Sequence, residues 1–136
     1  MARDKLSAYI AEKLFYYTNN PKKRCTDGEG RCFYSGKSVG KKTKGCLIGS
    51  MFTPAQRVIL DAKYKLKSLR EITKQSKFTP NFIVNNLELM EYLQSFHDDS
   101  SNFTDKGLSY EGKYELESII EEFELSRKYF MTILIS

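Results

Sequence analysis

The 136-residue chain contains few of the residues that build several kinds of site: it has one His, three Cys and no Trp. A single His excludes any site that needs two imidazoles from the same chain. Three Cys are too few for a disulfide framework and odd in number, so at least one thiol stays free. The length suits a single domain, residues 1–136, which can bury a core without cross-links.

Long apolar runs are also missing. The longest, residues 129–135 with a Thr inside it, is far shorter than the roughly 20 residues that span a bilayer. The first residues show no apolar stretch of signal-peptide length. We therefore expect a cytoplasmic protein with reduced thiols and no membrane partner. The apolar run itself could pack on the core or form an interface.

Charge is distributed unevenly, and the net value of +5 conceals this. Residues 1–77 hold 18 Lys and Arg against 6 Asp and Glu, whereas residues 78–136 hold 4 against 11. The densest basic stretch covers residues 22–44. Such a stretch attracts phosphates or acidic protein surfaces, or forms a solvated face that pairs with the protein's own acidic half. The sequence thus divides into a basic half, 1–77, and an acidic helical half, 78–136.

Apolar periodicity predicts about four helices. They are expected over residues 3–18, 54–74, 80–96 and 113–130. The second and third each follow a Phe-Thr-Pro triplet, in which Thr53 or Thr79 would cap the helix and Pro would occupy its first position.

A change of composition separates the first two helices: residues 21–50 hold six of the eight glycines. Two short apolar pieces, Cys-Phe-Tyr at 32–34 and Cys-Leu-Ile at 46–48, flank a Lys-rich stretch. This pattern predicts a β-hairpin over 31–49 with a long basic tip. The expected fold class is α+β, mostly helical, with this one β-hairpin inserted between the first and second helices. Cys32 and Cys46 could face each other across the hairpin, and the sequence leaves open whether they pair.

Motifs for catalysis and metal binding are incomplete. Gly36 and Gly40 are separated by three residues, where a phosphate-binding loop needs four, and Lys41 is followed by Lys42 rather than Ser or Thr. The Cys residues lack the close pairing of structural zinc ligands. We expect no cofactor and no bound metal.

Residues 97–99 offer the one alternative to this expectation, a site for a metal ion. His97 and Asp98 are similar to the His-Asp pair of metal-dependent phosphohydrolases, which use further His ligands that this chain lacks. The same residues are typical of a helix C-terminus followed by a turn. A metal-dependent hydrolase at His97 and Asp98 is therefore the least favoured function.

The predicted contact residues are basic or aromatic and lie in or beside the hairpin. They are Lys22, Lys23, Arg24, Tyr34, Lys37, Lys41, Lys42 and Lys44. They would hold the phosphates of a small nucleotide ligand or an acidic protein surface. A nucleic acid could use the same patch, although no known nucleic-acid-binding motif is present. The oppositely charged halves could also pair between copies in a homo-oligomer.

Three segments carry a resemblance: residues 32–34, Gly-Cys-Leu-Ile-Gly at 45–49, and Leu-Gln-Ser-Phe-His-Asp at 93–98. Together they resemble a loose family of small uncharacterised proteins encoded by phages and bacteria. The long Lys-rich stretch between the two Cys departs from that pattern, and the family implies no activity. The resemblance implies a small accessory protein working inside a bacterial cell. By analogy with such phage proteins, we expect a non-enzymatic antagonist of a host defence component, which binds a host protein or sequesters a nucleotide.

Overall fold

The computed structural model describes residues 2–20, 46–64 and 67–135. The α-helices in these ranges are α1 (Arg3–Asn19), α2 (Pro54–Lys63), α3 (Leu69–Gln75), α4 (Asn81–Val84), α5 (Leu87–Asp98), α6 (Tyr110–Glu122) and α7 (Met131–Leu134). Three short 3-10 helices are η3 (Gly49–Met51), η4 (Ser100–Asn102) and η5 (Arg127–Phe130). Strands β1 (Phe103–Thr104) and β2 (Gly107–Leu108) form an antiparallel pair.

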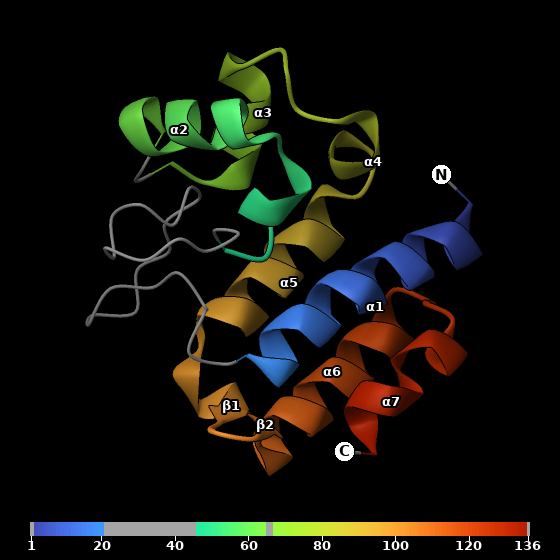
Figure 1. Cartoon of the computed structure of the whole chain (residues 1–136). Coiled ribbons are helices and arrows are strands. Elements are labelled where there is room, and N and C mark those ends of the chain that lie inside the picture. The colour runs from blue at the N-terminus through green and yellow to red at the C-terminus, as the bar shows by residue number, and fades with distance from the viewer. Residues whose placement is uncertain (1, 21–45, 65–66, 136) are drawn as a thin grey trace.

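Helices α1, α5 and α6 lie alongside one another and build the larger part of the core (Figure 1). Helices α2, α3 and α4 lie together at one end of α5, and the β1–β2 pair lies at the other end (Figure 1). Strand β2 contacts both α1 and α6. Helices α5 and α6, which follow each other in the chain with η4 and the hairpin between them, are in contact.

The first predicted helix is confirmed by α1. Its apolar stripe of Leu6, Ile10, Leu14 and Tyr17 is buried, with no member more than 1% exposed. Ser7 lies beside this stripe and is fully buried as well. Its hydroxyl donates to the Arg3 carbonyl and accepts a hydrogen bond from the backbone N–H of Ser126 at 2.8 Å, which ties α1 to the chain after α6.

The prediction of a β-hairpin between the first and second helices is wrong. The two strands lie between α5 and α6, and the described residues form seven α-helices instead of about four. Residues 46–48, predicted as the second strand, are a turn that leads into η3, where Ser50 N–H donates to the Cys46 carbonyl at 2.8 Å. A run of three apolar residues is too short to distinguish a strand from a buried turn. The first predicted strand lies outside the described residues.

The observed hairpin depends on one glycine. Thr104 pairs with Gly107, and Gly107 adopts a φ of +147°, a region that side-chain-bearing residues rarely occupy. The Thr104 hydroxyl accepts from Lys106 N–H and donates to the Gly107 carbonyl, which closes the turn.

Two predicted helices are each broken in two. Residues 54–74 form α2 and α3, because Ser68 and Glu71 make a capping box that starts a new helix. Residues 80–96 form α4 and α5, and the break falls at Asn85 and Asn86, a residue type whose side chain competes for backbone hydrogen bonds. Val58, in the middle of α2, is 44% exposed.

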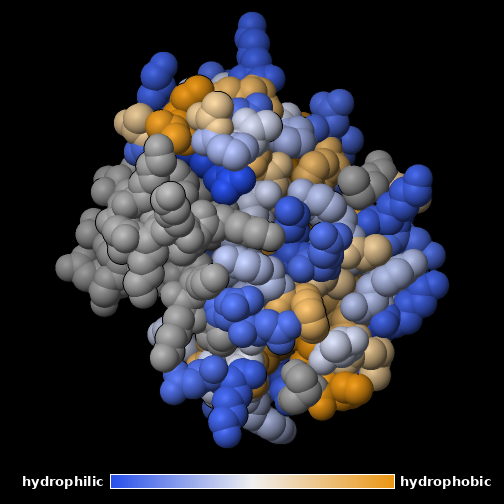
Figure 2. All heavy atoms as spheres, viewed as in Figure 1, coloured by the Kyte–Doolittle hydropathy of each residue, from blue (hydrophilic) through white to orange (hydrophobic). Residues whose placement is uncertain are grey.

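The predicted C-terminal helix, 113–130, is also shorter than expected. Helix α6 ends at Glu122, and Glu124 adopts a φ of +53°. The chain then turns back through η5 and α7, which bury Phe130 and Ile133 and leave Ile135 74% exposed. Apolar side chains at the surface gather near α2 and near α7 (Figure 2). No α-helix in the described ranges has the length and apolar character needed to cross a membrane.

Candidate binding groove between two helices

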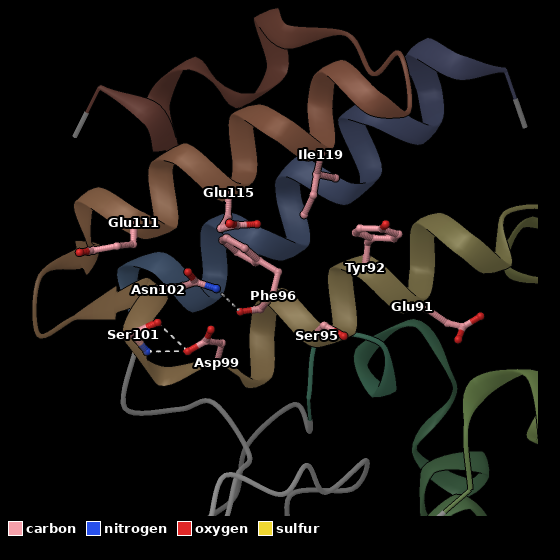
Figure 3. Close-up of a pocket in the computed structure, with 10 residues that line it drawn as sticks. All are labelled: Glu91, Tyr92, Ser95, Phe96, Asp99, Ser101, Asn102, Glu111, Glu115 and Ile119. Carbon is pink, nitrogen blue, oxygen red and sulfur yellow. Dashed lines mark hydrogen bonds between the residues drawn. The ribbon is translucent and has the colours of Figure 1, made fainter.

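A groove of about 590 Å³ opens between α5 and α6, at the end nearer the hairpin. Its described lining residues are Glu91, Tyr92, Ser95, Phe96, Asp99, Ser101, Asn102, Glu111, Glu115 and Ile119. They come from α5, η4 and α6 (Figure 3). The set contains four carboxylates and no Lys or Arg, so the described lining carries negative charge alone.

The floor of the groove is apolar. Phe96 and Ile119 are each 4% exposed, and the Phe96 ring packs against Phe103 of β1 with centroids 5.7 Å apart. Tyr92 stands higher on the wall and is 51% exposed. Its ring contacts Phe123 edge-to-face, with centroids 5.3 Å apart. A ligand would therefore meet an exposed aromatic ring above an apolar floor.

The carboxylates differ in how far they are already engaged. Glu91 forms an ion pair with Arg70 of α3, with Oε1 2.6 Å from Nε. Asp99 caps η4, where its Oδ1 accepts from the backbone N–H and the hydroxyl of Ser101. Glu111 and Glu115 lie one turn apart on α6 and make no ion pair or hydrogen bond through their side chains with the described residues. These two carboxylates are available to a ligand.

A chain of backbone and side-chain hydrogen bonds closes one end of the groove. The Asn102 amide Nδ2 donates to the Phe96 carbonyl at 3.0 Å, and the Asn102 carbonyl accepts from Ser109 N–H at 2.9 Å. The Ser109 hydroxyl donates to the Ser101 carbonyl and accepts from Gly112 N–H, which caps α6. The end of α5, η4 and the start of α6 are thus joined directly.

The contact residues predicted from the sequence cannot be placed. Lys22, Lys23, Arg24, Tyr34, Lys37, Lys41, Lys42 and Lys44 all lie outside the described residues, as do Cys25 and Cys32. Cys46 is described: its thiol is free and fully buried, and its sulfur accepts from Gly49 N–H at 3.2 Å. Cys46 thus packs as a small apolar residue.

His97 lies in the last turn of α5 and is fully buried. Its Nδ1 is 3.0 Å from Asp98 Oδ1, and its ring meets Tyr17 of α1 edge-to-face at 4.9 Å. Asp98 also accepts from Gln94 Nε2 at 3.0 Å. In the part of the chain that the structure describes, no three His, Cys, Asp or Glu side chains are placed to hold a metal ion. The contacts of His97 are those of a packed histidine near a helix end.

The groove was not predicted from the sequence, where the candidate contact residues were basic and lay in the first half of the chain. The sequence contains one indication of the groove, an equal spacing within two pairs of residues. Tyr92 and Phe96 lie four residues apart, and so do Glu111 and Glu115. Residues four apart share a helix face, so each pair forms a stripe. The two stripes lie near each other only because α5 and α6 are in contact. No local sequence pattern specifies that contact.

No protein-family model, no curated protein and no solved structure matches this chain.

Proposed function

We propose that this protein is a non-enzymatic binding protein, and that the groove between α5 and α6 holds a cationic segment of a partner protein. The observation that supports this best is a concave surface with an apolar floor and two carboxylates, Glu111 and Glu115, that make no ion pair with the described residues. Apolar surface supplies affinity when it is covered, and complementary charge selects the partner.

The same charges argue against a phosphate ligand at this groove. Glu111 and Glu115 would repel a nucleotide or a nucleic acid, since like charges brought together in a partly desolvated site destabilise the complex. A phosphate ligand would need the basic residues 22–44, and their role stays a prediction from charge alone. Replacing Lys41 and Lys42 by Ala tests that prediction separately, and loss of nucleotide or nucleic-acid retention would support it.

The class of partner follows from the resemblance described above. A small accessory protein of phage type, working inside a bacterial cell, would meet host proteins, and we propose a host defence component as the partner. Binding would block a surface that the component needs. The alternative of a metal-dependent hydrolase at His97 and Asp98 gains no support from the contacts of those residues.

The test is a titration with a fluorescein-labelled six-residue peptide that contains Arg, Lys and Leu. Wild-type protein is expected to bind it, and the double variant Glu111→Gln with Glu115→Gln is expected to bind about tenfold more weakly, since each partly exposed ion pair contributes about 0.7 kcal/mol. The matched control is Glu121→Gln with Glu122→Gln, which removes the same charge from an exposed part of α6.

The control separates groove binding from general attraction to an acidic protein. If both double variants lose the same affinity, the carboxylates of the groove have no special role and the proposal is wrong. Absence of binding by the wild-type protein would overturn it as well. A six-residue acidic peptide serves as the negative ligand and is expected not to bind.

A further inference from the structure

We infer that the α5–α6 groove recognises an arginine side chain of its partner, in preference to lysine. The inference rests on the proposed function, because it names the residue that the same groove would take. Its basis is Asn102, a buried residue that lines the groove together with the two available carboxylates and whose amide oxygen makes no hydrogen bond with the described residues.

Asn102 is 3% exposed and nevertheless lines the groove. Its amide can be assigned without ambiguity, because Nδ2 donates to the Phe96 carbonyl at 3.0 Å and a carbonyl accepts only a donor. The oxygen therefore lies on the side away from Phe96, as Figure 3 shows. Oδ1 makes no hydrogen bond with the described residues. An acceptor on the groove lining that has no partner in the protein can take a donor supplied by a ligand.

The groove then presents three separate acceptor groups: the Asn102 oxygen and the carboxylates of Glu111 and Glu115. An ammonium group is a compact point charge with three donors on one nitrogen. A guanidinium group carries five N–H donors spread over a plane, so it can reach acceptors in different directions at once. Several dispersed acceptors therefore favour arginine over lysine.

The aromatic wall supports the same choice. Tyr92 is half exposed and its ring contacts Phe123, so it offers an aromatic surface at the groove. A guanidinium stacks on such a ring through its flat face and keeps its edge free for hydrogen bonds. Lysine has no flat face and must give up hydrogen bonds to approach the ring. Phe96 and Ile119 beneath would contact the methylene groups of the arginine.

The dimensions suit a segment of a protein chain. The lining of α5 extends from Glu91 to Phe96 and continues to Asp99 at the helix end, which at 1.5 Å per residue is about 12 Å. An extended peptide advances about 3.3 Å per residue, so the groove spans roughly three to four residues. One arginine with a neighbour on each side would fill it.

The experiment compares three labelled peptides that differ only at the central residue: arginine, lysine or citrulline, whose urea group has the shape of arginine without its charge. Wild-type protein is expected to bind the arginine peptide about tenfold more tightly than the lysine peptide, and the citrulline peptide more weakly still. In Glu115→Gln the preference for arginine over lysine is expected to fall towards unity. Glu122→Gln, a change of the same kind outside the groove, should keep it.

Asn102→Ala removes the buried acceptor and is expected to reduce arginine binding about tenfold. Since this variant also removes a hydrogen bond that joins α5 to η4, its melting temperature is measured alongside. If it does not fold, Glu115→Gln decides the question.

The outcomes distinguish this inference from the proposed function. Equal binding of the arginine and lysine peptides would overturn the arginine assignment and leave a cationic groove. Failure of both peptides to bind would overturn the proposed function itself.

Discussion

Gly112 of α6 lies directly against the backbone carbonyl of Asn102. A Cβ atom built at position 112 would be 2.1 Å from that oxygen and 2.9 Å from the carbonyl carbon. The neighbour is backbone that is itself held by hydrogen bonds from Ser109, so it cannot move aside cheaply. The closeness of α6 to η4 therefore depends on the absence of a side chain at one position.

Gly112→Ala is expected to destabilise the protein by about 1–3 kcal/mol, the usual cost of overpacking a buried contact. Urea unfolding measures the change. Ser118→Ala, at an exposed position of the same helix, is the control and should change the free energy of unfolding by less than about 0.5 kcal/mol. Equal stability of Gly112→Ala and wild type would show that the contact is not tight in solution.

Replacing Thr by Ala is expected to cost different amounts of stability in the two Phe-Thr-Pro triplets. Thr53 caps α2 through a capping box with Gln56, whereas Thr79 makes no cap to α4 and contacts Ser76 instead. Thr53→Ala should therefore cost about 1 kcal/mol of stability, and Thr79→Ala clearly less. Chemical denaturation of both variants checks this. A larger loss at Thr79 would contradict the assigned caps.

Glu124 carries the one positive φ among the described residues other than glycine. It follows α6, where Leu125 N–H donates to the Ile120 carbonyl at 2.9 Å, the arrangement in which glycine is the preferred residue. Glu124→Gly is expected to stabilise the protein by about 0.5–1 kcal/mol, because it removes the strain of a side chain in this conformation. Glu122→Gly, inside the same helix, should have the opposite sign. Thermal unfolding of the pair decides.

Acidification should weaken the start of α3. The pKa of Glu71 lies below its usual value of 4.5, first because its carboxylate accepts the Ser68 N–H and also because Lys67 is nearby. A lowered pKa means that the stabilisation is present above about pH 4.5 and is lost as the pH falls through the lower, folded-state pKa. Glu71→Gln removes this titration, so its stability difference from wild type should shrink on acidification. Glu122→Gln is the control, with no such pH-dependent difference expected.

The parts of the fold that were predictable from sequence are those set by local chemistry. The four-residue spacing in α1 and the capping box at Thr53 need only neighbours in sequence, and both are confirmed. Ser68 and Glu71 also have the spacing of a capping box, but the single helix predicted over 54–74 rested on apolar periodicity alone. The cap predicted at Thr79 is wrong. The same Phe-Thr-Pro triplet supplies a capping Thr to α2 but not to α4.

The groove could not be predicted for a different reason. Tyr92 and Glu115 are 23 residues apart, and the structure that joins them is a close approach at Gly112 together with a short hairpin at 103–108. The same reasoning placed a hairpin earlier in the chain, where short apolar pieces and glycines suggested one. Glycine marks both tight turns and close contacts, and sequence alone does not say which role applies.

The hydrogen bonds that close the groove also make it observable. The amide protons of Ser109 and Gly112 are both donated within the described structure, one to a backbone carbonyl and the other to a side-chain hydroxyl. The Ser109 amide donates to the Asn102 carbonyl of η4, so its proton exchanges with deuterium when that contact between η4 and the start of α6 opens. The Gly112 bond to Ser109 Oγ lies within the first turn of α6 and opens when that turn frays, so its exchange rate is the internal reference. A partner bound in the groove would slow exchange at Ser109 without contacting its amide. Hydrogen exchange at Ser109 therefore reports occupancy of the groove from within the protein.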